Sequence, residues 1–334
     1  MKVIEYNERG VPHEVCACAE VAEPRAPGPG EILVSVLASA INPADLLTIE
    51  GRYPGPQTLP ARQGIEGVGL VEQFGAGVVG FELGDHVMLL ARDNWVQQAL
   101  VRADNVIKIP RQLNIYQAAT MKANPPSAML MLDDYVSLRH GDWVIQNAAN
   151  SAVGQHVIRL ASARGIRTIN IVRSGSWVAP LKAMGADIVM VDNSTLPKQV
   201  RAEIGNDSVP LALDAIGGKA SMRLADCLSD NGIVVNYGFL SGEPCMITPS
   251  QAILRGIELK GFWLVKNLFQ KPRRQIEHVF NEVTRMIFNG TFNTSIEAIY
   301  RLDQVGEALA HAEKEKRKGK ILFAPNPDKI PANG

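Results

Sequence analysis

The sequence predicts an α/β protein of two domains, one with a doubly wound parallel sheet and one with a partly open β-barrel. Its 334 residues, 46% of them hydrophobic and 20% charged, are enough for a large core and about two domains. Residues 1 to about 123 hold short β-like runs separated by Gly and Pro. From about 142 onwards, apolar strands alternate with segments of helix length, which is typical of parallel βαβ units.

The first domain is expected to be an open barrel because its strand candidates follow one another with no helix-length segment between them. These candidates cover 31–37, 67–72, 85–90 and 95–101. A helical stretch over 273–288 and a last strand at 319–323 are expected to return to this domain. The predicted boundaries are therefore 1–123 with 268–334 for the barrel domain, and 124–267 for the parallel-sheet domain.

The second domain has enough strand candidates for a complete dinucleotide-binding sheet of the Rossmann type. In chain order they are 143–146, 168–172, 188–191, 211–214, 232–236 and 257–262.

Composition excludes several classes of partner. The 34 basic and 34 acidic residues balance, so no overall field attracts nucleic acid or an anionic membrane surface. No apolar run is long enough to span a membrane, and the chain starts with a strand candidate rather than a signal peptide. We expect a cytoplasmic protein, with an organelle matrix as the alternative. The four cysteines form no disulfide or zinc pattern.

A turn of small residues over 147–154 follows the strand at 143–146 and precedes a helix. This order directs free backbone N–H groups and the positive end of the helix towards a diphosphate. Of the three glycines in the usual dinucleotide fingerprint only Gly154 is present, and taken alone the turn could be an ordinary strand-to-helix connection. The residues expected to contact the cofactor are Asn150, Ser151, Ala152, Val153 and Gly154.

Arg173 makes a dinucleotide the better interpretation and selects its type. It ends the next strand nineteen residues after Gly154, where NAD-binding proteins place an acidic residue against the ribose 2′-hydroxyl. A cation at this place suits the 2′-phosphate of NADPH, and Ser174 beside it offers a hydroxyl. The alternative is an ordinary exposed arginine at a strand end.

At this point the chain resembles the medium-chain dehydrogenase/reductases, whose catalytic domain is GroES-like. Segments 41–45, 51–54 and 64–69 are similar to both the 2-enoyl thioester reductases and the quinone reductases of that group. Segments 145–155, 168–173 and 261–264 look more like the enoyl reductases.

The resemblance implies NADPH-dependent reduction of the α,β double bond of an enoyl thioester, carried by coenzyme A or by an acyl carrier protein. One alternative is an NADPH-dependent reductase of quinones, enones or acrylates. Another is an NADPH-binding protein without catalytic activity.

Zinc-dependent members of the superfamily have Cys where this chain has Asn42, and His where it has Ile65. Without both ligands no catalytic zinc site is expected, and hydride transfer has to proceed without a metal. Tyr53 matches the family tyrosine whose phenol serves as electrophile or proton donor. Its alternative role is that of a turn residue on an apolar loop.

Further roles are implied by the resemblance alone. It places Asn42, Tyr237, Phe262 and Trp263 at the cofactor, and Trp95, Asn124 and Trp263 along the substrate channel. Each indole could instead be part of a core. The resemblance also implies a homodimer formed by pairing the strands near 257–263.

Overall fold

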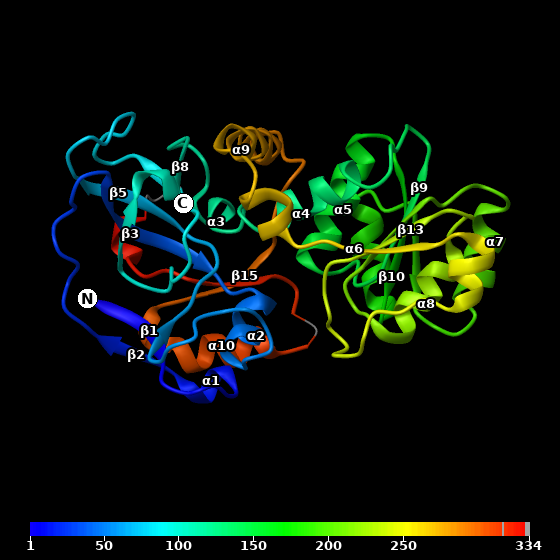
Figure 1. The fold of residues 1–334 in the computed structure, drawn as a ribbon, viewed down its shortest axis with the longest axis horizontal. Coiled ribbons are helices and arrows are strands. Elements are labelled where there is room, and N and C mark those ends of the chain that lie inside the picture. The colour runs from blue at the N-terminus through cyan, green and yellow to red at the C-terminus, as the bar shows by residue number, and fades with distance from the viewer. Residues whose placement is uncertain (316, 331–334) are drawn as a thin grey trace. The chain divides into compact units, whose positions relative to one another are not determined.

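The computed structural model describes residues 1–315 and 317–330, which fall into two compact units (Figure 1). Unit 1 comprises Met1–Ala123 and the chain from Asn293 onwards, and unit 2 comprises Asn124–Phe292. Residues 316 and 331–334 of the predicted barrel domain lie outside the described residues.

In the structure the chain returns to unit 1 at Asn293, whereas the expected domain boundary is at 268. The two positions differ because helix α9 (Arg273–Phe288) lies in unit 2. Its buried face includes Val279, Phe280 and Val283, and it packs against helix α4 (Asn124–Asp133). Phe280 also stacks on Phe269, with ring centroids 6.2 Å apart. A helix that buries an apolar stripe belongs to the unit against which the stripe packs.

Unit 1 is built from two antiparallel-rich sheets, and its expected barrel character is confirmed. A three-stranded sheet has the order β2-β1-β4, and a larger sheet has the order β15-β16-β3-β5-β6-β8 with β7 also paired to β3. The strands are β1 (Lys2–Tyr6), β2 (Cys16–Glu20), β3 (Glu31–Ala40), β4 (Ala61–Arg62), β5 (Val68–Phe74), β6 (His86–Leu89), β7 (Gln98–Arg102), β8 (Val106–Ile109), β15 (Ile296–Tyr300) and β16 (Lys320–Phe323). Its helices are α1 (Pro12–Val15), α2 (Pro43–Ile49), α3 (Ile115–Ala118) and α10 (Val305–Glu313).

Unit 2 contains the predicted parallel sheet, with strand order β11-β10-β9-β12-β13-β14. All six predicted strands are present: β9 (Trp143–Gln146), β10 (Arg167–Val172), β11 (Ile188–Val191), β12 (Leu211–Asp214), β13 (Ile233–Asn236) and β14 (Glu258–Gly261). Besides α4 and α9, its helices are α5 (Ala152–Ala163), α6 (Val178–Ala183), α7 (Leu196–Ile204) and α8 (Gly218–Cys227).

The strand order of unit 2 reverses between β9 and β12, because β10 and β11 extend the sheet to one side and β13 and β14 to the other. In a doubly wound sheet, ligands bind beyond the carboxyl ends of the strands at this switch point. The turn after β9 therefore lies where a nucleotide is expected. None of the helices in the described part of the chain is long and apolar enough to cross a membrane.

Candidate functional site

The turn between β9 and α5 has the features of a diphosphate site. Ser151 caps the helix, and its hydroxyl accepts a hydrogen bond of 3.1 Å from the Gly154 N–H. In the described structure the N–H groups of Ala152 and Val153, at the first two helical positions, have no acceptor. These groups and the helix dipole favour an anion at this end of α5.

Gly154 is required by the close approach of α5 to the preceding turn. A Cβ atom at this position would lie 2.6 Å from the Ala149 carbonyl oxygen and 2.7 Å from its Cα. Both atoms belong to the backbone, which has no room to shift. The remaining glycine of the fingerprint is therefore the one needed for packing of helix against strand, and the cradle fits a dinucleotide.

Asp214, at the end of β12, ties together loops that leave three neighbouring strands. Its buried carboxylate accepts hydrogen bonds from Asn147 after β9, from Asn236 at the end of β13 and from Ser221 of α8. Burial alone would raise the pKa of Asp214, but these hydrogen bonds and that of the Gly217 N–H hold it below the ordinary value. Asp214 is thus an ionised anchor for the carboxyl edge of the sheet, although the sequence showed no signal for this role.

Arg173 and Ser174 follow β10 and are both exposed. The Ile171 carbonyl, two residues before Arg173, accepts a hydrogen bond of 3.2 Å from the Ala149 N–H. This bond places the end of β10 beside the turn after β9. Ser174 accepts a hydrogen bond from the Ser176 N–H, which leaves its hydroxyl within the short turn at Gly175–Trp177.

Tyr237 and Asn124 lie in unit 2 with polar atoms that have no hydrogen bond of good geometry there. Tyr237 follows β13, and burial raises the pKa of its phenol, while the neighbouring Ser151 hydroxyl weakly opposes that shift. Asn124 begins α4, and its side-chain nitrogen is buried. Both residues can therefore still bind a ligand.

Phe262 and Trp263 differ in exposure. Phe262 is buried, and its N–H continues the ladder of β13 and β14 by donating to the Asn236 carbonyl. Trp263 is 43% exposed. The expected contribution of the Phe262 ring to cofactor binding stays a prediction, and the Trp263 side chain is the more exposed of the two.

Tyr53 lies in unit 1 on the loop after α2, and it is half-buried. Two backbone hydrogen bonds tie the start of the loop to that helix, from the Gly51 N–H to the Thr48 carbonyl and from the Arg52 N–H to the Leu47 carbonyl. The loop is therefore an ordered extension of α2. This order is what a phenol needs if it is to meet a reacting carbonyl.

Asn42, before α2, is buried and held at both ends of its side-chain amide. Its nitrogen donates to the Glu66 carboxylate at 2.7 Å, and its oxygen accepts a hydrogen bond from the buried Lys320 ammonium. The Asn42 amide is therefore engaged within unit 1, and its expected contact with the cofactor stays a prediction. Ile65, at the other position that holds a zinc ligand in relatives, donates its N–H to Asp45.

The same buried cluster contains two more ionisable groups. Burial raises the pKa of Asp45 to about 7, although the Asn42 and Ile65 N–H groups favour its ionised form. Burial lowers the pKa of Lys122 to about 7, and Glu66 opposes that shift. Lys122 donates to three backbone carbonyls, those of Ile65, Leu90 and Ala91. No group of three His, Cys, Asp or Glu side chains among the described residues is arranged to hold a metal.

Trp95 packs in the core of unit 1. Its ring has no exposed surface, its indole N–H donates to the Ala40 carbonyl at 3.3 Å, and it meets Phe323 edge to face at 5.3 Å. These contacts favour its alternative role in a core, and its expected place in the substrate channel stays a prediction.

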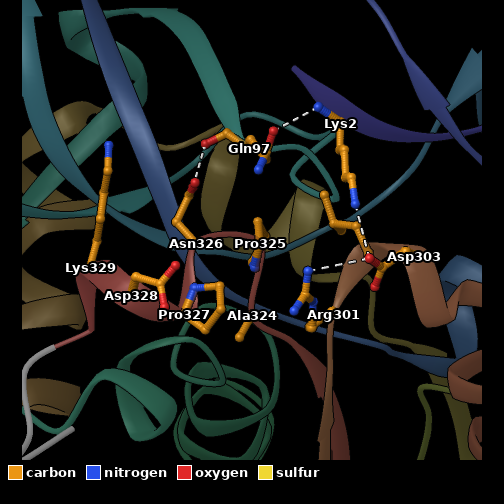
Figure 2. Close-up of a pocket in the computed structure, with 11 residues that line it drawn as sticks. Lys2, Gln97, Arg301, Asp303, Ala324, Pro325, Asn326, Pro327, Asp328 and Lys329 are labelled. Carbon is orange, nitrogen blue, oxygen red and sulfur yellow. Dashed lines mark hydrogen bonds and ion pairs between the residues drawn. The ribbon is translucent and has the colours of Figure 1, made fainter.

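A pocket of about 190 Å³ lies elsewhere in unit 1 (Figure 2). Three of its cations already have acidic partners: Lys2 and Arg301 share Asp303, and Lys329 contacts Glu72. None of the residues that line it is a predicted site residue. We assign this pocket no part in the reaction.

Comparison with known proteins gives one family match in each of the two units. Residues 28–111 match the alcohol dehydrogenase GroES-like domain family, and residues 152–285 match the zinc-binding dehydrogenase family. The mitochondrial enoyl-[acyl-carrier-protein] reductase of Dictyostelium discoideum is 36% identical over 301 residues, which is 88% of this chain and 86% of that protein. The chain belongs to the enoyl reductase branch of the medium-chain dehydrogenase/reductases. The human enzyme of that name is 35% identical to this reductase over 79% of this chain and 72% of its own length.

Solved structures place the reductase in the same group. The complex of Etr1p with NADP and crotonyl-CoA has a TM-score of 0.86 and 26% identity, covering 97% of this chain and 99% of that one. A candidate NADPH:quinone reductase from Bacillus thuringiensis has a TM-score of 0.89 and 28% identity over 97% of this chain and 98% of that one. The predicted superfamily and fold class are therefore confirmed.

Proposed function

We propose that this reductase transfers hydride from NADPH to the β-carbon of a 2-enoyl thioester and thereby saturates its α,β double bond. The observation that carries the proposal is the 36% identity, over most of both chains, with a protein named as an enoyl-[acyl-carrier-protein] reductase. The geometry of the α5 cradle, with unpaired N–H groups at Ala152 and Val153, supports a dinucleotide in unit 2.

NADPH, when bound, supplies the hydride. Its diphosphate would be held by the N–H groups of the Ser151–Gly154 turn, and its 2′-phosphate by Arg173 with Ser174 beside it. We further assign Asn150, Tyr237 and Trp263 to the cofactor side of unit 2, because the first two adjoin Ser151 and the third is exposed after β14.

Tyr53 would polarise the substrate carbonyl, which a metal does in other members of the superfamily. Its O–H donates to the thioester carbonyl oxygen as negative charge develops there, and it or a water bound to it delivers the proton that the α-carbon needs. Asn124, with an unpaired side-chain nitrogen, is the residue of unit 2 that we assign to the acyl chain.

A second candidate acceptor is a quinone, enone or acrylate, favoured by the structural similarity to the Bacillus thuringiensis protein. The decisive experiment follows NADPH oxidation with crotonyl-CoA, crotonyl-acyl carrier protein, simple quinones and enones under the same conditions. Turnover of either thioester with kcat/KM well above that of the quinones is expected. Turnover of quinones alone would replace the proposal by the second candidate.

We also propose that two copies associate through β14. Its four residues are exposed, and within the described sheet it pairs on one side only, with β13. Ile253 and Leu254, just before this strand, are 77% and 78% exposed. An edge strand beside apolar side chains is suited to pairing with another copy. Sedimentation should give a dimer, and Leu254→Glu should shift it towards monomer.

The compartment is a separate question. The relatives named above are mitochondrial, whereas we expect this chain in the cytoplasm, with an organelle matrix as the alternative. Fractionation of cells that express the native protein separates the two.

A further inference from the structure

Arg9 holds the loop of Tyr53 from one side. Its guanidinium donates to the Thr48 carbonyl at 2.9 Å and to the Pro56 carbonyl at 2.8 Å. Thr48 lies on α2, before Tyr53 in the chain, and Pro56 follows Tyr53. The planar Arg9 guanidinium therefore bridges the two ends of the segment that contains Tyr53. Arg9 itself lies far away in the sequence, just after β1.

Arg92 holds the same loop from a second direction. It donates to the Pro54 carbonyl at 3.1 Å and to the Thr48 hydroxyl at 3.3 Å. Pro54 is the residue directly after Tyr53. Together the two arginines fix the backbone before and after the tyrosine.

The loop is packed closely as well as hydrogen-bonded. A Cβ atom on Gly51, whose φ is 79°, would lie 2.8 Å from the Arg9 Cδ. A Cβ atom on Gly55 would lie 2.2 Å from the Thr48 Cγ2. A side chain at either glycine would therefore force the loop, Arg9 or Thr48 to shift.

The hydrogen-bond partners of the two arginines indicate that both hold the loop of Tyr53. Among the described ion pairs neither Arg9 nor Arg92 takes part, and every hydrogen bond of both ends on the loop or on Thr48. Pro54 and Pro56 have no N–H, so the loop cannot form a regular ladder of its own. A guanidinium with its donors in a fixed fork is suited to bridge such carbonyls, whereas a lysine is not.

We propose that Arg9 and Arg92 are positioning residues that hold Tyr53 in place for the reduction. The inference rests on the proposed function, since it gives Tyr53 the role of meeting the acceptor carbonyl. The two arginines would act through the loop and not by touching the substrate. A displacement of a reacting group by about 1 Å can lower a rate roughly 100-fold, so loosening the loop is expected to be visible in kcat.

The first test compares Arg92→Ala, Arg9→Ala and Arg92→Lys with the unchanged enzyme in crotonyl-CoA reduction. Each alanine variant is expected to lower kcat by about tenfold or more, and Arg92→Lys by less, because one of two bridging bonds can persist. NADPH affinity, measured by fluorescence titration, should stay within about twofold, because all the hydrogen bonds of these arginines lie within unit 1. Arg25→Ala, which removes an exposed arginine bound to Glu31, is the matched control.

The second test places Arg92→Ala in the Tyr53→Phe background. If Arg92 acts through the tyrosine hydroxyl, its effect on kcat largely disappears once that hydroxyl is gone. An equal loss in both backgrounds would overturn the proposal and indicate a direct contact with substrate. Full activity of Tyr53→Phe alone would overturn it as well, and would also remove Tyr53 from the mechanism.

The third test does not depend on activity. Trypsin can cleave after Arg52, inside the clamped loop, and the alanine variants of Arg9 and Arg92 should be cleaved there faster than the unchanged protein and the Arg25→Ala control. Unchanged cleavage would show that the arginines do not order the loop. If crotonyl-CoA is not reduced at all, the proposed function fails, and the same variants are compared with the acceptor that is reduced.

Discussion

Asn42 donates a hydrogen bond of 2.7 Å from its side-chain nitrogen to Glu66, and both residues are buried in unit 1. The Lys320 ammonium binds the other end of the same amide. A position that carries a zinc ligand in metal-dependent relatives is thus occupied by the middle member of an internal chain of hydrogen bonds. Glu66 is the acidic end of this chain and also accepts the Ala123 N–H at 3.1 Å.

Glu66→Gln is expected to destabilise the protein by about 3–5 kcal/mol, because it removes a buried negative charge that favours the ammonium forms of Lys122 and Lys320. Asp45 is then the remaining acidic group that acts on both lysines. The new side-chain NH2 group would also face a donor, either the Asn42 side-chain nitrogen or the Ala123 N–H. Glu66 opposes the lowering of the pKa of Lys320, so the substitution should lower that pKa further. Urea unfolding measures the loss. Glu72→Gln, at the surface pair with Lys329, is the control, and an equal effect there would contradict the prediction.

Tyr53→Phe should lower kcat for crotonyl-CoA by about 100-fold or more, in the range expected for loss of a general acid or an oxyanion donor. NADPH should bind as before, because the cradle of the diphosphate is in unit 2. Steady-state kinetics measures kcat, and fluorescence titration measures the affinity for NADPH. This prediction also separates an enzyme from a protein that only binds the nucleotide, since the latter would show no turnover in either form.

Arg173→Ala should weaken NADPH binding by about tenfold to 100-fold and leave NADH binding unchanged, because a charge-assisted hydrogen bond contributes about 1.5–3 kcal/mol. Titration with both nucleotides tests this. Arg167→Ala is the matched control, since Arg167 starts the same strand and binds Asp207. Equal weakening of NADPH and NADH by Arg173→Ala would refute the contact with the 2′-phosphate.

Asp214→Asn should lower the free energy of unfolding at neutral pH by about 2–4 kcal/mol and should weaken NADPH binding, because Asn147 loses a charged acceptor. The folded-state pKa of Asp214 lies below its ordinary value of 3.8, so its ionised form contributes stability above that pH.

The contribution of Asp214 is lost as the pH falls below about 4. The difference in unfolding free energy between the two proteins should therefore shrink in acid. A difference that stays constant from pH 7 to about 2.5 would contradict the assignment.

Trp95→Phe tests whether this indole acts in the core or in the substrate channel. Removal of its hydrogen bond to Ala40 and of part of its buried ring should cost about 1–3 kcal/mol of stability. The ratio of kcat/KM for crotonyl-CoA to that for longer enoyl-CoA esters should not change. A changed ratio would restore Trp95 to the substrate channel.

The parallel sheet could be predicted because most of its strands are short, largely apolar runs followed by a helix-length segment. β14 is the exception, with Glu258 and Lys260 in an exposed strand. β2 (Cys16–Glu20) and β15 (Ile296–Tyr300) were not expected, since both are only partly buried and owe their strand form to neighbours. The unit to which α9 belongs also depends on tertiary packing, because an amphipathic helix does not carry the identity of its partner.

For site residues too, local signals can be read from the sequence and tertiary contacts cannot. The local sequence predicts the turn over 147–154 between a strand and a helix, since its signals lie within one short segment. It cannot show that Asn42 meets Lys320, which is 278 residues away in the chain, or that Arg9 reaches the carbonyl of Pro56. Those contacts exist only after the fold has formed.

Asp214 joins the loops after β9, β12 and β13, whereas the hydrogen bonds of the Ser174 hydroxyl stay within its own short turn. The turn that we assign to the diphosphate therefore depends on Asp214, which cannot change without disturbing several loops at once. In the segment that we assign to the 2′-phosphate, the Ser174 hydroxyl bonds only to Ser176. Over evolutionary time, or in the laboratory, a change of preference between NADPH and NADH can therefore be made in the segment after β10, while the rest of the nucleotide site is kept.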